Sequence, residues 1–315
     1  MLFELLKQPE KAIETYGLLV RGYKRSPLVA KANLQAGLAY EALGEDLKAA
    51  AAFSEAARRM KDNEEVRNLL WTAAEHYEKG TLWNKSYAAF SRFIKRFPKH
   101  QDVPEALFRM AEARRKVGRL QEAGAFYKRV VKQDPGTLFA ARALFQEGEA
   151  SFKHFKAIRI KIPLTKSLKK KTRAFKAVIN FYTKAVETRE MEVVTVSAYR
   201  LGEVFEHFAA SLLNAERPKN LNDAQLEEYM FQLEEKAYPF EEKAVTAYKS
   251  NVHRTQQTAG PYNEWVRKSY DRLADLRPVF YRRKEHTEQI VSNVDPRVFF
   301  LSSGQETLAR VMRED

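Results

Sequence analysis

The chain has 315 residues, of which 44% are apolar, 12% aromatic and 30% charged, a composition that favours a folded core over disorder. It contains no cysteine, which excludes a disulfide framework, a thiolate metal site and a cysteine nucleophile. The formal net charge of +14 directs attention to acidic partners. No apolar run is long enough to span a bilayer, and Met1 to Lys7 shows no signal-peptide pattern.

Helices are predicted almost throughout. Glycine and proline are scarce, at 12 and 11 residues, and apolar residues recur at i, i+3, i+4 and i+7. One departure is the alternation of Ile158, Ile160 and Ile162 with basic residues, which allows one short extended segment. The sequence therefore indicates the all-α class.

A repeat of small and aromatic residues lies between Lys31 and Met60. Its spacing is typical of a tetratricopeptide repeat, in which two antiparallel helices occupy about 34 residues. Small residues let the two helices approach closely, aromatic residues fill the space between helix pairs, and a glycine permits the tight turn. The residues at these positions are Gly37, Tyr40, Gly44, Ala49, Phe53 and Ala56.

Two further units of this kind end at Pro98 and Pro135. Each proline ends a second helix, because the residue before a proline is disfavoured in the helical region. Three matching units predict a right-handed α-solenoid of antiparallel helix pairs. The matching residues are Ala74, Tyr77, Ser86, Phe90 and Phe93 in one unit and Leu107, Ala111, Gly118, Ala123, Tyr127 and Val130 in the other.

The same register places Ala12, Tyr16 and Leu19 in the second helix of a preceding unit. Met1 then falls in the middle of that unit's first helix. Because the end units of a solenoid normally carry a polar capping face, we expect a longer form of the protein with at least one complete repeat before Leu2. Any export signal would lie in that upstream part.

After Pro135 the predicted units lengthen. We expect a regular array over residues 1–152, followed over 153–315 by a continuing solenoid with a basic insertion at 153–176, a capping helix and a tail. The landmarks expected in this half are a first helix with Leu144, Gly148 and Phe152, a partner with Val178, Tyr182 and Ala185, a first helix with Ala198, Leu201, Gly202 and Phe205, a loop around Pro218, Asn220 and Asn222, a helix from Leu226 to Tyr238, a second helix with Ala244 and Tyr248, a helix from Glu264 to Leu276, and a tail with Pro296, Val298 to Leu301 and a short helix from Gln305.

The stretch from Tyr87 to Val130, with its Phe97–Pro98 ending, resembles bacterial tetratricopeptide proteins of the cell envelope, the branch of outer-membrane assembly lipoproteins and Tol-Pal coordinator proteins. The second half resembles the C-terminal region of large envelope-associated repeat proteins of delta-proteobacterial type. These resemblances imply a scaffold in a multiprotein envelope complex and a periplasmic or membrane-associated location, with a cytoplasmic one left open.

Catalytic and metal sites are not predicted. The six histidines lie at least 24 residues apart, without the spacing of a zinc site, and we expect them at surfaces or helix ends, as for His100 in a loop. No phosphate-binding glycine motif occurs. Neighbouring acids on a helix point about 100° apart, so the paired glutamates are expected to be solvated. We predict a non-enzymatic protein without a cofactor.

The predicted partner groove is formed by Leu34, Trp71 and Phe108, which share the fifth position in successive first helices. That position tends toward the concave surface, where a helix or extended peptide could lie. Arg109 beside them suits a carboxylate. The lysine and asparagine clamp by which some repeat proteins grip acidic chaperone tails is not matched, because Leu34, Leu38, Thr72 and Glu105 occupy the other clamp positions.

The basic insertion, Lys153 to Lys176, holds ten Lys or Arg residues and no Asp or Glu. It could be a solvated hairpin docked through Ile158 to Leu164, or it could contact an acidic protein, an anionic membrane surface or nucleic acid. A nucleic-acid-binding adaptor is therefore the alternative function, although the rest of the chain is nearly balanced in charge. The basic patch expected to be exposed comprises Lys166, Lys169, Lys170, Lys171 and Arg173.

Overall fold

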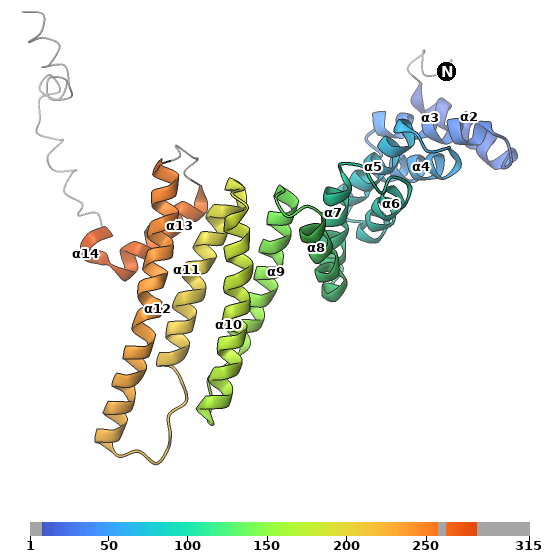
Figure 1. Cartoon of the computed structure of the whole chain (residues 1–315). Coiled ribbons are helices and arrows are strands. Elements are labelled where there is room, and N and C mark those ends of the chain that lie inside the picture. The colour runs from blue at the N-terminus through green and yellow to red at the C-terminus, as the bar shows by residue number, and fades with distance from the viewer. Residues whose placement is uncertain (1–7, 258–262, 282–315) are drawn as a thin grey trace, which may run out of the picture.

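The computed structural model describes residues 8–257 and 263–281. Within these ranges every regular element is a helix, so the predicted all-α class is confirmed. Figure 1 shows the helices stacked in chain order. They are α2 (Pro9–Gly22), α3 (Leu28–Ala42), α4 (Asp46–Arg59), α5 (Glu64–Lys79), α6 (Trp83–Arg96), α7 (Val103–Lys116), α8 (Leu120–Gln133), α9 (Leu138–Ala157), α10 (Leu164–Glu187), α11 (Met191–Leu213), α12 (Asp223–Gln257), α13 (Glu264–Leu276) and α14 (Pro278–Tyr281).

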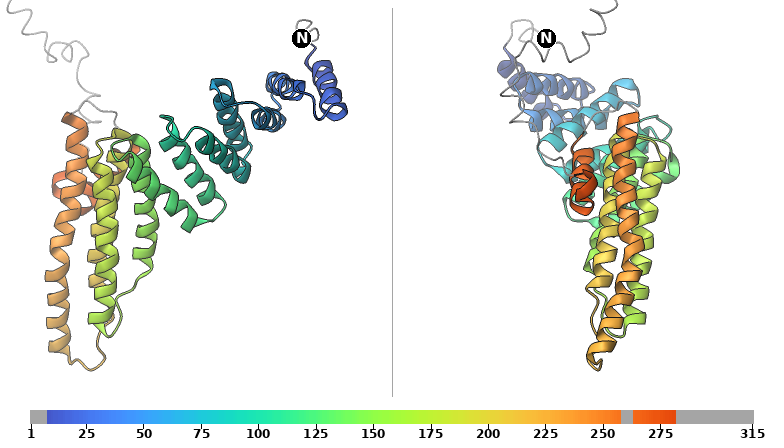
Figure 2. Two further views of the ribbon diagram at one scale, coloured as in Figure 1. Left: turned by 45° about the vertical axis from the view of Figure 1, so that its right-hand side comes forward. Right: turned by 90° about the vertical axis from the view of Figure 1, so that its left-hand side faces the viewer.

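The helices form antiparallel pairs in two layers. Each helix packs against the one before and the one after it, and the first helices α7, α9, α11 and α13 also contact one another in succession. These first helices are therefore the inner layer of the solenoid, and the second helices α8, α10 and α12 are the outer layer. In Figure 2 the short helices α2 to α8 form one curved arm, and the long helices α9 to α12 stand side by side as a second block, with α13 and α14 against it.

The repeat residues pack as the spacing predicts. Phe53 of α4 is 2% exposed, and a Cβ atom at Gly37 of α3 would lie 2.5 Å from its ring. Only glycine therefore permits this approach of the two helices. Gly44 turns the chain between them with φ +72°, in the left-handed region that favours glycine.

Elongation begins at α9. The expected boundary at residue 152 falls inside this helix, which runs on to Ala157. Residues 153–176 are the last turn of α9, a connection over residues 158–163, and the first half of α10. The expectation of an insertion ahead of a separate partner helix is therefore wrong, because α10 runs unbroken from Leu164 to Glu187.

The connection from α9 to α10 is docked only in part. Ile158 and Ile160 are buried, at 8% and 5% exposure, whereas Ile162 is 46% exposed. The backbone carbonyl of Ile160 accepts a hydrogen bond of 3.1 Å from the N–H of Glu216, which follows α11. The segment is neither helix nor strand, so it is irregular chain held to the end of α11.

A second difference concerns α12. The sequence predicts a helix from Leu226 to Tyr238 and a separate second helix beyond it, but the structure has one 35-residue helix with Pro239 inside it. Proline removes one helical hydrogen bond. Leu233 and Ala237 before the proline and Ala244 after it are all buried, and α12 packs along α11. This packing on both sides of the proline holds the helix continuous.

The ends of the array agree with the register where the structure describes them. Ala12, Tyr16 and Leu19 lie on α2, and α13 has the predicted bounds. Residues 1–7 and the expected tail elements from Pro296 onward lie outside the described residues. None of the described helices is long and apolar enough to cross a membrane.

Candidate functional site: the inner face and the basic patch

The inner face carries two parallel columns of side chains. The predicted groove residues Leu34, Trp71 and Phe108 continue in Phe145, each 37 residues after the last. Residues four positions later share the same helix face. This second column consists of Leu38 on α3, Glu75 on α5, Glu112 on α7 and Glu149 on α9, with Tyr199 and Glu203 in the same relation on α11.

Trp71 is a packing residue as much as a surface residue. Its ring lies edge-on to Phe90 and Phe93 of α6, with centroids 5.2 Å apart in each case. The indole N–H donates a hydrogen bond of 3.0 Å to Oε1 of Glu75. Only part of the tryptophan faces outward, so any ligand would meet its edge and the neighbouring carboxylate.

Arg109 is already paired. Its guanidinium lies 3.1 Å from Glu75, 3.3 Å from Glu78 and 2.9 Å from Glu105, and it stacks 5.4 Å from the centre of the Trp71 ring. Burial raises the pKa of the Glu78 carboxyl above its ordinary value, against the opposing effect of the arginine. Arg109 therefore joins α5 to α7, and three carboxylates surround it where a free cation for a partner's carboxylate was expected.

Phe108 and Leu34 are also partly buried. The Phe108 ring lies 5.9 Å from Tyr127 of α8 and from Phe139 of α9, and Leu34 packs against the main core. The more accessible apolar side chain at this end is Leu38, which is 45% exposed. The sequence analysis named it only as a clamp position, although the 37-residue spacing places it at the head of the glutamate column.

Arginines connect the glutamates of successive inner helices. Arg200 of α11 pairs with Glu149 of α9 at 2.8 Å, and Arg272 of α13 pairs with Glu206 of α11. In the outer layer, the Tyr182 hydroxyl of α10 donates a hydrogen bond of 2.6 Å to Glu149. These side-chain bonds fix the carboxylates of the inner face in place.

The basic patch is exposed except at one position. Lys166, Lys169, Lys170 and Arg173 are exposed on α10 as predicted, but Lys171 is 1% exposed. On a helix, one residue in three or four faces the core. Because Lys169, Lys170 and Lys171 are identical neighbours, the sequence does not show which of them is buried. The expectation that Lys171 belongs to the exposed patch is wrong.

Lys171 closes the end of α9. Its ammonium donates hydrogen bonds of 2.8 Å to the carbonyls of Phe155 and Ile158 and lies 3.2 Å from Nε2 of His207 on α11. The ammonium also lies 4.1 Å from the centre of the Phe155 ring. Burial lowers the pKa of Lys171 to about 8, so the group is charged at neutral pH. The ammonium supplies a partner to the Ile158 carbonyl at the helix end and a second donor to the Phe155 carbonyl, which also accepts a hydrogen bond of 3.2 Å from the N–H of Ile158.

A cleft opens beside this lysine. Lys156, Arg159, Lys161, Ser211 and Asn214 are among the residues that line it. The pKa of the His207 imidazole is held below its ordinary value by burial and by the charges of Lys171 and Lys156. Since the three protons of the Lys171 ammonium are all engaged, this lysine has no donor left for a ligand.

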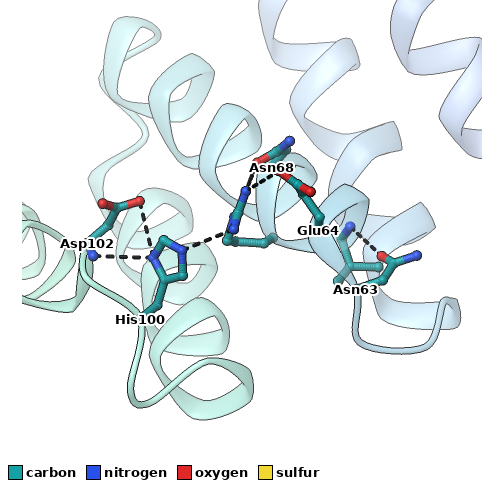
Figure 3. Close-up of polar contacts among 7 residues, drawn as sticks. Asn63, Glu64, Asn68, His100 and Asp102 are labelled. Atoms are coloured by element: carbon teal, nitrogen blue, oxygen red, sulfur yellow. Dashed lines mark hydrogen bonds and ion pairs between the residues drawn. The ribbon is translucent and has the colours of Figure 1, made fainter.

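His100 illustrates the structural role of histidines here. It lies in the loop between α6 and α7, where Nε2 is 3.1 Å from the Arg67 guanidinium and Nδ1 is 3.2 Å from the backbone nitrogen of Asp102 (Figure 3). Asn63 caps α5 in the same region by accepting a hydrogen bond of 2.9 Å from the N–H of Val66. In the part of the chain that the structure describes, no three His, Asp or Glu residues gather as metal ligands.

Comparisons with known proteins agree with the repeat register. Residues 105–137 match the tetratricopeptide repeat family. No curated protein sequence matches the chain. Similar solved structures include a tetratricopeptide repeat protein from Parabacteroides merdae ATCC 43184, which is 13% identical with a TM-score of 0.33 over 85% of this chain and 93% of that one.

Two other structures are similar at the same level. One is a protein from Bacteroides ovatus ATCC 8483, provisionally described as a protein-binding protein, with 16% identity and a TM-score of 0.32 over 66% of this chain and 99% of that one. Another is from a computational design of self-assembling cyclic homooligomers, with 15% identity and a TM-score of 0.27 over 86% and 91%. No conclusion about function follows from likenesses this low. The match over residues 105–137 identifies a tetratricopeptide repeat in that part of the chain, and the described helices form the antiparallel pairs of an α-solenoid.

Proposed function

We propose that this protein is a non-enzymatic scaffold whose inner face binds a helical or extended segment of a partner protein. The observation that carries the proposal is the pair of columns at 37-residue spacing, one aromatic and one acidic, that runs along helices α5, α7 and α9. A repeated surface of this kind suits a partner segment with a repeated pattern. A peptide of two or three turns would meet the same chemistry at each step.

The partner segment should be cationic as well as apolar. Six inner-face carboxylates are held by only three guanidinium groups in this region, and the aromatic edges lie beside them. Lysine or arginine side chains on the partner would be attracted to the carboxylates and to the aromatic faces. The residues concerned are Glu75, Glu78, Glu105, Glu112, Glu149 and Glu203 with Arg109, Arg115 and Arg200.

The biological setting is proposed on the sequence resemblance. The likeness of residues 87–130 to envelope repeat proteins supports a place in a multiprotein complex of the bacterial envelope, in the periplasm or at its membranes. Fractionation of the full-length protein tests this, and recovery wholly in the cytosol would contradict it.

A selection from a library of displayed 16-residue peptides tests the binding proposal. Immobilised full chain should enrich peptides in which Lys or Arg alternates with apolar residues at helical or strand spacing. Enrichment of acidic peptides, or of none, would contradict the proposed chemistry of the inner face. Oligonucleotide binding that weakens steeply with salt would instead favour the nucleic-acid adaptor.

A further inference from the structure

The outer faces of α10 and α12 carry opposite charge. On α10, Lys166, Lys169, Lys170, Arg173 and Lys176 are all exposed and no acidic residue lies among them. We call these five residues the α10 face. On α12, the exposed side chains between residues 227 and 238 include Glu227, Glu228, Phe231, Glu234, Glu235 and Tyr238, and we call these six the α12 face. Gln232 and Lys236 are also exposed in this stretch and are not part of that face.

Neither face is neutralised within the chain. No ion pair within 4.0 Å involves a charged group of either face, in the residues that the structure describes. Like charges three or four positions apart on a helix repel one another, so each face destabilises itself. A surface of opposite charge placed against each would relieve that repulsion.

The α12 face also exposes aromatic side chains. Phe231 is 56% and Tyr238 58% exposed, and they lie seven residues apart, on the same side of the helix. Exposed aromatic rings among charges are typical of protein interfaces, where they are enriched.

The two faces are in register. In Figure 1 α10 and α12 run in the same direction on either side of α11. The rings of Phe175 on α10 and Phe240 on α12 lie 5.7 Å apart, which sets these two residues at one level along the helices. Lys169 on α10 and Glu234 on α12 each lie six residues before these phenylalanines, about 9 Å along the helix axes, and so share a level. By the same count Lys170 lies at the level of Glu235, and Arg173 at the level of Tyr238.

A two-fold axis uses this register. If the axis runs between α10 and α12, parallel to both, the α10 face of each copy meets the α12 face of the other copy. No shift along the helices is needed. The same contact then occurs twice, as in an isologous dimer. Lys169 and Lys170 of one copy oppose Glu234 and Glu235 of the other, and Arg173 opposes the Tyr238 ring.

We infer that the chain forms a two-fold dimer in which the basic α10 face of each copy packs against the acidic and aromatic α12 face of the other. The occupant of the basic patch is therefore a second copy of the chain. This inference does not depend on what the inner face binds, because that face belongs to the other layer of helices.

Sedimentation at several protein concentrations tests the inference on the full chain. We expect a dimer that dissociates as salt is raised from 50 to 500 mM, because screening weakens exposed charge pairs. The variant K166E/K169E/K170E/R173E makes both faces acidic, and E227K/E228K/E234K/E235K makes both basic. Each alone should dimerise at least tenfold more weakly than the wild type.

The decisive experiment is sedimentation of an equimolar mixture of the two variants. The acidic faces of one variant are complementary to the basic faces of the other in both contacts. The mixture should therefore sediment as a dimer, although each variant alone sediments as a monomer. A control variant K31E/K95E/K99E/K132E carries the same change of charge at exposed lysines elsewhere and should dimerise like the wild type. Circular dichroism checks that every variant keeps its helix content.

Any of the following results would overturn the inference. They are a wild type that stays monomeric at low salt, a mixture that stays monomeric, a mass above the dimer that shows open-ended assembly, and a monomer whose α10 face binds vesicles of anionic phospholipid. The last would assign the basic face to a membrane surface. A control variant that dimerises as weakly as the face variants would also count against it.

Discussion

Replacing Lys171 by methionine removes the buried ammonium and keeps the length of its apolar stem. Two carbonyls at the end of α9, those of Phe155 and Ile158, then lose the hydrogen bonds of 2.8 Å that they accept from it. A hydrogen bond to a charged group contributes about 1.5–3 kcal/mol. Part of this loss is offset because an ammonium no longer has to be buried, so we expect Lys171→Met to lower the free energy of unfolding by about 2–4 kcal/mol.

The matched control is Lys132→Met. This lysine of α8 lies outside the α10 face and loses the same charge from an exposed position, where substitutions usually change stability by about 0.5 kcal/mol or less. Urea unfolding followed by circular dichroism compares the two variants, and hydrogen exchange should show faster local opening around residues 152–168 in Lys171→Met alone. Equal stability and equal exchange in both variants would refute the capping role of Lys171.

Three further predictions follow from the packing. Gly148→Ala should destabilise by about 1–3 kcal/mol in a thermal melt, because its Cβ would lie 2.5 Å from the Tyr182 ring, whereas Gly136→Ala meets open space and should leave the melting temperature nearly unchanged. The pKa of His207 is lowered in the fold, so between that pKa and pH 6.5 the unfolded chain binds a proton that the folded chain does not. The free energy of unfolding should therefore fall as the pH drops from 6.5 toward the folded-state pKa, by at most about 1.4 kcal/mol per pH unit. His207→Gln should lack this pH dependence when urea titrations at pH 7.5 and 5.5 are compared. Trp71→Ala should weaken partner binding at least tenfold and also lower the free energy of unfolding by about 2 kcal/mol, as a loss of core contacts does, so an unchanged urea midpoint would count against its contacts with α6.

The repeat architecture could be predicted from the sequence because its signal is local. Small residues such as Gly37 and Ala49 recur at fixed distances from the aromatic Phe53, and only one helix pairing satisfies that spacing. The structure adds that the constant 37-residue interval extends to Phe145 and Glu149, a regularity that a direct comparison of the units could have found.

The features that could not be predicted depend on contacts between distant segments. The burial of Lys171 depends on the end of α9 and on His207 of α11, which lie 13 to 36 residues away. The continuity of α12 through Pro239 depends on packing against α11, and local helix rules argue against it. The sequence predicts that Arg109 is available to a partner's carboxylate, but three carboxylates of the chain itself, from two helices, surround its guanidinium.

The measurement that tests the central claim most directly is the affinity of one selected cationic peptide for three forms of the protein. Leu38→Asp with Glu75→Lys alters two exposed positions of the inner face, and Leu18→Asp with Glu14→Lys makes the same changes at exposed positions of α2 in the outer layer. We predict that the inner-face variant binds the peptide at least tenfold more weakly than the wild type, while the α2 variant binds it equally well. Equal affinity of all three folded proteins for the peptide would contradict the claim that the inner face is the binding surface.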